Sequence, residues 1–160
     1  GEVVAVWVQC NHVQDISPVR VFSGLKNLSC WSSSPTISKL SDISPLQGLQ
    51  LRQFNGSYTK ISDLTPFQEM PLEILDLRET RIRNLSSLRG MPLRNLSIHL
   101  TKIDNLTPLE DCKTLEILEL YYINVSPSSI AALQKALPNC RIDWDDPAKA
   151  TTPPAAAGTR

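Results

Sequence analysis

One sequence pattern recurs along this chain at a nearly constant interval. Aligned on Leu-x-x-Leu-x-Leu-x-x-Thr-x-Ile, the copies begin at Val3, Leu25, Leu51, Leu72, Leu93 and Leu115. The first two copies are degenerate, and the last four begin 21, 21 and 22 residues apart. A unit this short cannot bury its apolar side chains by itself, so each copy must pack against its neighbours. The chain is therefore constrained to fold as a stacked array.

Each copy begins with a predicted β-strand. The apolar residues at its fourth and sixth positions alternate with residues that face the opposite side, as in a half-buried strand. This pattern predicts strands near 4–9, 26–30, 52–56, 73–77, 94–98, 116–120 and 140–144. It also predicts nearly complete burial for the apolar residues of the three clearest copies, which are Leu75, Leu77, Leu96, Ile98, Leu118 and Leu120.

Two further positions of the unit are polar. The turn after the strand carries Asn11, Thr59, Thr80 or Thr101. A threonine offers one hydroxyl where asparagine offers a carboxamide, so we expect a sparser ladder of hydrogen bonds between coils. The return segment begins with Asp or Asn, then Ile or Leu, then Ser or Thr, and Pro follows in four of the five copies, as in Asp42-Ile-Ser-Pro. Ser or Thr is a common helix N-cap and Pro suits the first helical position, so each return segment predicts one short 3₁₀ turn.

These units predict an α/β solenoid. The repeat length falls in the roughly 20–29-residue window of leucine-rich repeats, whose parallel sheet lines the concave face. Short 3₁₀ turns would line the convex face, and a capping helix near 127–137 would close the C-terminal end. Residues 1–145 are predicted to form the domain, with six repeats and the cap near 126–144. The Pro/Ala/Thr-rich stretch 146–160 is predicted to be disordered.

The two ends and one insertion differ from the regular units. Ser126 as N-cap and Pro127 at the first helical position begin the predicted cap helix. At the other end, the apolar run Val3–Val8 has no polar cap before it, which indicates an uncapped end available for contact with a partner. The second copy contains an extra small polar segment, Ser32–Thr36, which predicts a surface loop.

Composition argues against several classes of function. The 16 Lys and Arg residues balance 16 Asp and Glu, so no net field attracts nucleic acid or anionic lipid. No segment approaches the ~18 consecutive apolar residues that suggest a membrane span. The four cysteines lack the C-x-x-C spacing of a zinc site, and we expect them to be buried thiols. The sequence therefore predicts no metal and no other cofactor.

The segment Ser41–Gly48, with its Asp-Ile-Ser-Pro-Leu core, resembles the short-repeat leucine-rich class that includes the internalins. The same segment and segments 88–93, 109–113 and 132–147 resemble, more closely, repeat regions of planctomycete-type bacterial proteins. In that family such regions often follow a serine/threonine protein kinase domain, so the resemblance implies a ligand-sensing or regulatory C-terminal region. These residues contain no glycine-rich loop, His-Arg-Asp or Asp-Phe-Gly motif, so kinase activity would belong to residues outside this chain.

The outward-facing strand positions provide a candidate binding site. Trp, Tyr and Arg recur there, and these residues often anchor protein interfaces. The candidate site comprises Trp7, Trp31, Tyr58, Asp76, Arg78, His99, Glu119 and Tyr121. Five of them, Trp31, Tyr58, Arg78, His99 and Tyr121, are expected to form a continuous stripe. No Ser or Cys nucleophile accompanies His99, so we do not expect catalysis.

The sequence favours a non-enzymatic module that binds a protein or peptide on its concave face. Nucleic acid is not an expected partner, and the segment is not expected to insert into a membrane. The alternative, from the resemblance, is the regulatory C-terminal region of a bacterial serine/threonine protein kinase. A third hypothesis is a structural spacer, for which substitutions on the concave face would have no functional effect.

Overall fold

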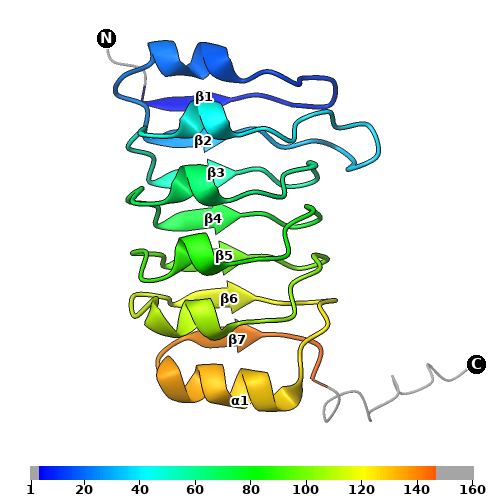
Figure 1. Cartoon of the computed structure of the whole chain (residues 1–160), viewed down its shortest axis with the longest axis vertical. Helices are drawn as coiled ribbons and strands as arrows, with labels where there is room; N and C mark the ends of the chain where they lie inside the picture. The colour runs from blue at the N-terminus through cyan, green and yellow to red at the C-terminus, as the bar shows by residue number, and fades with distance from the viewer. Residues whose placement is uncertain (1–3, 147–160) are drawn as a thin grey trace, which may run out of the picture.

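Strands and short helical elements alternate along the chain. The computed structural model describes residues 4–146, which stack as successive coils (Figure 1). The elements are β1 (Ala5–Trp7), η1 (Ser17–Val21), β2 (Asn27–Ser29), η2 (Ser44–Leu46), β3 (Gln53–Asn55), η3 (Thr65–Phe67), β4 (Ile74–Asp76), η4 (Ser86–Leu88), β5 (Asn95–Ser97), η5 (Thr107–Asp111), β6 (Ile117–Glu119), α1 (Pro127–Ala136) and β7 (Arg141–Asp143). The η elements are 3₁₀ turns. The fold is the predicted leucine-rich-repeat solenoid with a C-terminal capping helix.

The strands form one parallel seven-stranded sheet in sequence order. Each strand is three residues long and begins and ends inside its predicted range. Hydrogen bonds between coils continue past the strand ends: the Gly56 N–H donates to the Asp76 carbonyl and the Tyr58 N–H to the Arg78 carbonyl, both at 2.9 Å. The residues just after the strands are therefore also held in register from coil to coil.

The predicted core is confirmed. The side chains of Leu75, Leu77, Leu96, Ile98, Leu118 and Leu120 are 0–1 % exposed. These residues lie at equivalent places in three successive coils, because Leu75 pairs with Leu96 and Leu96 with Leu118 in the sheet. Each coil thus buries its apolar side against the coils above and below it, which is how a solenoid accumulates stability.

The third coil fills its share of the core in a different way. Gly56 occupies the sixth position, where the next coils have Leu77 and Ile98. The ring of Phe54 takes up this space, since a Cβ added to Gly56 would lie 2.6 Å from the Cε1 atom of Phe54. The same ring packs on Phe67, with 5.0 Å between the ring centroids. In this coil the large ring of Phe54, next to a glycine, therefore fills the space that two leucines fill in the following coil.

The 3₁₀ turns do not begin as predicted. Ser and Thr do not act as N-caps, because the Asp or Asn two residues earlier accepts the first backbone N–H. Asp15 Oδ1 accepts from Ser17 at 2.7 Å, and Asn105 Oδ1 accepts from Thr107 at 3.0 Å. The same contact is made by Asp42, Asp63 and Asn84. This is an Asx turn, and hydrogen bonds from Ser17 lower the pKa of the Asp15 carboxyl.

The repeated threonines bond within their own coils rather than between coils. The Thr80 hydroxyl donates to the Leu77 carbonyl at 2.6 Å, and Thr59 and Thr101 make the same contact three residues back. The predicted inter-coil ladder is therefore wrong at these positions. The short threonine side chain reaches the carbonyl of its own turn, where it satisfies a buried acceptor.

The inserted segment Ser32–Thr36 is anchored at its first residue. Ser32 is fully buried, contrary to the surface-loop prediction, and its hydroxyl donates to Asn11 Oδ1 at 3.0 Å. The backbone N–H of Ser33 donates to the same oxygen at 2.9 Å. Ser33 and Thr36 are exposed, as predicted. The second coil projects farther than the others at the edge where the strands end (Figure 1).

The C-terminal cap begins as predicted. Ser126 Oγ accepts the backbone N–H of Ser129 at 3.1 Å, and Pro127 is the first helical residue. The Tyr122 N–H, whose equivalents donate to a carbonyl of the next coil, here donates to Asp145 Oδ2 at 2.5 Å. The Asp145 carboxylate thus supplies the acceptor that a backbone carbonyl of the next coil supplies elsewhere in the stack. From residue 147 onward, the predicted disordered tail lies outside the described residues. Among residues 4–146, no helix has the length and apolar character needed to span a membrane.

Candidate functional site

The sheet face is defined here as the outward-facing residues at the third, fifth and seventh positions of each copy. Strand pairing aligns the fifth positions in one column: Trp7, Ser29, Asn55, Asp76, Ser97 and Glu119. The seventh positions of the second to sixth coils follow two residues later and form a second column: Trp31, Ser57, Arg78, His99 and Tyr121. Seven of the eight candidate residues lie in these two columns, and the eighth, Tyr58, does not.

The predicted stripe is interrupted at the third coil. Tyr58 follows Ser57, which holds the seventh position, and its backbone is left-handed with φ of 59°. Ser57 is buried, and its hydroxyl donates to Asn55 Oδ1 at 2.7 Å. A small side chain therefore separates Trp31 from Arg78 in this column, and Tyr58 is half-buried in the turn that follows.

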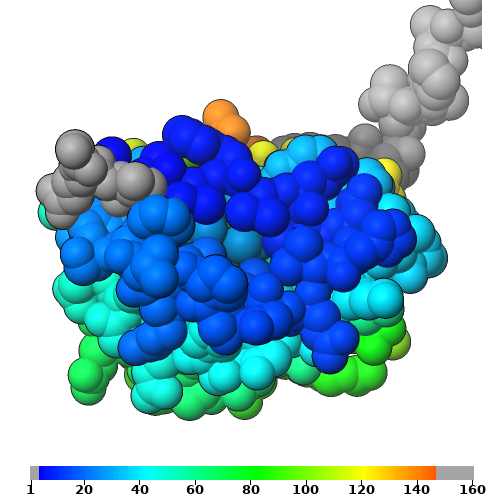
Figure 2. Space-filling model, turned by 90° about the horizontal axis from the view of Figure 1, so that it is seen from above, coloured from blue at the N-terminus to red at the C-terminus, as the bar shows by residue number. Residues whose placement is uncertain are grey.

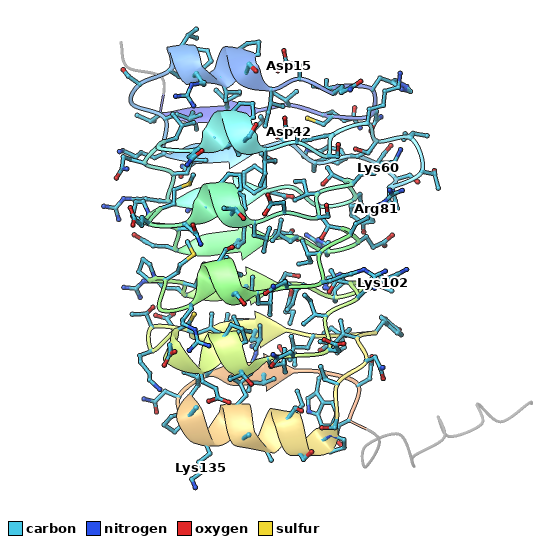
Figure 3. The ribbon with its side chains drawn as sticks, in the orientation of Figure 1. Asp15, Asp42, Lys60, Arg81, Lys102 and Lys135 are labelled. Atoms are coloured by element: carbon cyan, nitrogen blue, oxygen red, sulfur yellow. The ribbon has the colours of Figure 1, made fainter. Side chains whose placement is uncertain are left out.

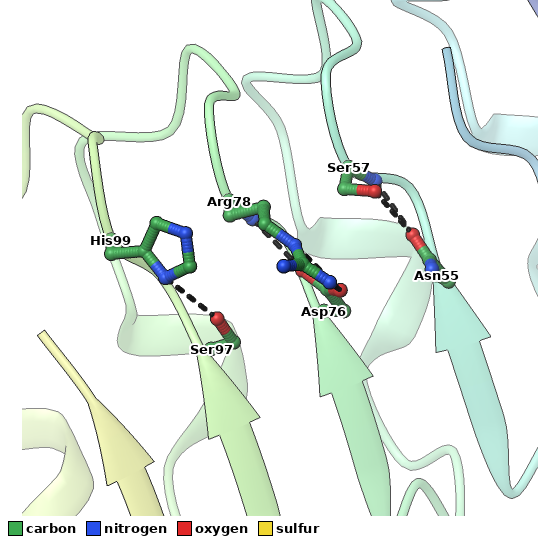
Figure 4. Close-up of polar contacts among 6 residues, drawn as sticks. All are labelled: Asn55, Ser57, Asp76, Arg78, Ser97 and His99. Carbon is green, nitrogen blue, oxygen red and sulfur yellow. Dashed lines mark hydrogen bonds and ion pairs between the residues drawn. The ribbon is translucent and has the colours of Figure 1, made fainter. Parts of the chain in front are cut away.

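Fifth and seventh positions of the same coil are hydrogen-bonded to each other. Figure 4 shows this contact in three successive coils, as Asn55 with Ser57, Asp76 with Arg78, and Ser97 with His99. Residues two apart in a strand point to the same side of the sheet, so their side chains meet. These contacts fix side-chain orientations before any partner binds, which reduces the entropy lost on binding.

The strongest of these contacts joins Arg78 to Asp76. Arg78 Nε lies 2.9 Å and Arg78 Nη2 lies 2.6 Å from Asp76 Oδ2. The Asp76 carboxylate raises the pKa of the Arg78 guanidinium. The side chains of Arg78 and Asp76 are 38 % and 16 % exposed, so the pair is only partly solvated. Arg78 is therefore a folded-back, charge-compensated residue rather than a free cation.

Two shallow hollows lie side by side on the sheet face. One is bordered by Trp7 and Gln53, the other by Ile117 and Glu119, and both include Ile74 and Asp76. Ile74 is 37 % exposed, so an apolar side chain lies where the two hollows meet. An apolar floor with polar groups around it is typical of sites that bury a ligand's side chain.

Two exposed apolar residues, Leu100 and Tyr122, were not among the predicted site residues. They are 43 % and 70 % exposed and lie beside the seventh-position column. Both have left-handed backbones with φ of 56°, as do the equivalent Tyr58 and Glu79. A left-handed L-residue costs roughly 1–2 kcal/mol, which Gly, and in part Asn, would avoid. The sequence signal that could have identified these two residues is a large side chain at a turn position that favours Gly or Asn.

We expect Leu100→Asn and Tyr122→Asn to leave the free energy of unfolding unchanged or to raise it by up to about 1 kcal/mol, because Asn tolerates the left-handed region. The same variants should weaken binding of a sheet-face partner. Chemical denaturation and a binding titration would measure the two effects. Ile74→Asn, in a regular strand, should instead lower stability. A loss of more than about 1 kcal/mol at Leu100 or Tyr122 would show that these side chains serve the fold.

The N-terminal end of the stack presents a separate apolar surface. Figure 2 looks down on this end, where side chains of the first coil cover the view. Val21 is 76 % exposed, Trp7 75 % and Val4 50 %. Trp7 is also a fifth-position residue of the sheet face, so the two surfaces adjoin.

The cysteine and histidine side chains are the other groups that could take part in chemistry. No group of three or more His, Cys, Asp or Glu in residues 4–146 is placed to hold a metal ion. All four cysteines are free and buried, as expected, and burial raises the pKa of the Cys140 thiol to about 11. The His99 ring contacts the Ser97 hydroxyl and the edge of Tyr121, 6.5 Å away between centroids. His99 is thus held by one residue of its own coil and one of the next.

No protein-family model and no curated protein matches this chain. Internalin C2 of Listeria monocytogenes is similar in structure, with a TM-score of 0.77 and 23 % identity over 94 % of this chain and 67 % of that one. A second Listeria monocytogenes internalin gives a TM-score of 0.69 and 23 % identity over 83 % and 38 % of the two chains. A leucine-rich-repeat protein of Leptospira interrogans gives 0.60 and 23 % identity over 82 % and 34 %. The present chain thus spans little more than a third of the latter two, and these likenesses establish the fold.

Proposed function

We propose that the chain is a non-enzymatic leucine-rich-repeat module that binds a protein or peptide on its sheet face. The observation that carries this proposal is the cluster of large side chains, three exposed and one half-buried, just after the fifth and sixth strands. His99, Leu100, Tyr121 and Tyr122 lie on adjacent coils, joined by the backbone bond from Leu100 N–H to the Tyr121 carbonyl at 2.9 Å. We call these four residues the aromatic corner.

Two features support a binding role for the aromatic corner. Its exposed side chains contribute little to the buried core, and Leu100 and Tyr122 are retained despite an unfavourable backbone conformation. The same left-handed turn occurs at Tyr58 and Glu79, so the fold requires this backbone conformation but does not require an exposed apolar side chain at it. Tyr and other large amphipathic side chains also dominate the binding energy of protein interfaces. The hollows around Ile74 would extend the contact surface toward the N-terminal coils.

We expect Tyr121→Ala to weaken partner binding by about 1 kcal/mol or more while leaving the melting temperature nearly unchanged. Tyr121 is 38 % exposed, and its hydroxyl makes no hydrogen bond within residues 4–146. The partner would first be captured with the isolated chain, and the variant then compared by calorimetric titration and thermal melting. The corresponding Arg78→Ala variant is a less clean test, because it leaves the Asp76 carboxylate partly buried without its partner.

Gln68→Ala and Arg89→Ala are the matched controls, since both residues are exposed and lie at the 3₁₀ turns or just after them. Neither should alter binding, and Arg89→Ala should cost little stability because its ion pair with Asp111 is exposed. If these controls abolished binding while Tyr121→Ala had no effect, the partner would use the opposite face and the proposal would be wrong.

Two further proposals concern the parent protein and the N-terminal end of the stack. The resemblance to planctomycete-type repeat regions suggests a ligand-sensing region of a bacterial serine/threonine kinase, and a kinase domain in the same reading frame would support it. The exposed Val4, Trp7 and Val21 suggest a second contact surface at the N-terminal end. Substituting Val21→Asp would test it, because a partner bound there would be lost without any change at the aromatic corner.

A further inference from the structure

Four consecutive coils place a basic residue at the same point of the turn that follows the strand. These residues, which we call the basic column, are Lys39, Lys60, Arg81 and Lys102. The register is set by the backbone: the Lys60 N–H donates to the Leu40 carbonyl and the Arg81 N–H to the Ile61 carbonyl, each at 2.8 Å. Figure 3 shows Lys60, Arg81 and Lys102 one below another along one edge of the stack. Hydrogen-bonded coils are about 4.8 Å apart, so like charges are held close together.

The basic column is not neutralised within the protein. None of its four side chains forms an ion pair with another residue of the described range 4–146. The edge where the strands begin is arranged differently, because there the signs alternate and adjacent coils pair. Arg52 pairs with Glu73, and Arg94 with Glu116. The protein thus uses complementary charges on one edge and repeats a single sign on the other, where neighbouring cations repel.

A surface hollow lies beside the lower part of the basic column. It has a volume of about 600 Å³ and is lined by Ser62, Thr80, Arg81, Arg83, Asn84 and Lys102. Three cations line this hollow, and no carboxylate does. Ser62 and Asn84 also offer hydrogen-bond donors, which suit the oxygen atoms of an anionic group.

Nearby carboxylates indicate where along the column an anion would bind best. Asp42 and Asp63 follow the column three residues later in the second and third coils, and both accept hydrogen bonds within their turns. In the next two coils the equivalent residues are the neutral Asn84 and Asn105. Glu79 and Asp104 each lie two residues from a cation of this part, and neither lines the hollow, although Asp104 borders a neighbouring hollow together with Arg83. The charged residues that line the hollow itself are the cations Arg81, Arg83 and Lys102.

We propose that the basic column and this hollow bind a linear polysaccharide that carries sulfate or carboxylate groups. Such a chain repeats its charge on successive sugar rings, and a ring is similar in length to the spacing between coils. An extended peptide fits less well, because side chains on one side of it repeat every ~6.6–7 Å. Duplex nucleic acid fits less well because each strand carries a charge about every 3.4 Å along the helix axis, which is closer than the spacing between coils.

The test is a titration of the purified chain into fluorescently labelled heparin, a sulfated polysaccharide, followed by anisotropy at two salt concentrations. We expect saturable binding that weakens as the salt concentration rises. Binding releases cations from the polyanion, and this release is less favourable when the solution already contains much salt. Lys60→Gln/Arg81→Gln/Lys102→Gln should weaken binding about tenfold or more. Asn124→Lys, which extends the column into the next coil, should strengthen it.

The matched control is Arg52→Gln/Arg94→Gln/Lys135→Gln, which removes the same charge from exposed sites elsewhere. It should change the affinity less than about threefold if position rather than net charge matters. An equal loss in the control would overturn the proposal, as would the absence of heparin binding by the unaltered chain. Tighter binding of polyglutamate or of a single-stranded oligonucleotide would show that the class of ligand is wrong. Thermal melting of each variant would confirm that it is folded.

Discussion

Phe54→Ala is expected to lower the free energy of unfolding by about 3–5 kcal/mol, the range for removing a large aromatic side chain from a core. The ring is 1 % exposed and packs against Phe67. The ring also covers Gly56, which has no side chain that could move into the vacated space. The cavity should therefore persist. Equilibrium denaturation in urea would measure the loss.

A second substitution tests the physical reason. Gly56→Leu alone should destabilise the protein by about 1–3 kcal/mol or more, because its first side-chain atom would already overlap Phe54 and Ile61. Combined with Phe54→Leu, it restores the two leucines found in the next coil, and the pair should be more stable than Gly56→Leu alone. If the double variant were no better than that single variant, Phe54 would not be filling the place of a leucine at position 56.

Leu96→Ala is expected to cost about 2–5 kcal/mol, from lost transfer energy and the cavity it leaves. Leu96 is 1 % exposed and lies between Leu75 and Leu118 of the neighbouring coils, so atoms on both sides lose contacts. Leu96→Met keeps most of the volume and should cost less than about 1.5 kcal/mol. A loss under about 1 kcal/mol for Leu96→Ala would mean that this column is not the centre of the core.

The candidate site was predictable in outline. Strand periodicity is enough to assign Trp7, Asp76 and Glu119 to one column and Trp31, Arg78, His99 and Tyr121 to the next. The orientation of these side chains was not predictable, because it depends on hydrogen bonds between residues two apart. Arg78 illustrates this: its position follows from the repeat, whereas its contact with Asp76 depends on rotamers that the repeat does not specify.

The sequence by itself determined the solenoid, the parallel sheet and the buried leucines, because a period of about 21 residues with alternating apolar positions admits few other packed arrangements. Tertiary structure decided the features that depend on neighbouring coils or on local backbone conformation. Phe54 fills the space above Gly56, and Leu100 and Tyr122 adopt left-handed backbones. The insertion in the second coil hides the alignment of Lys39 with Lys60 until backbone hydrogen bonds set the register. Spacing along a chain fixes which residues share a face, whereas contacts between coils fix which of them are paired, buried or free to bind.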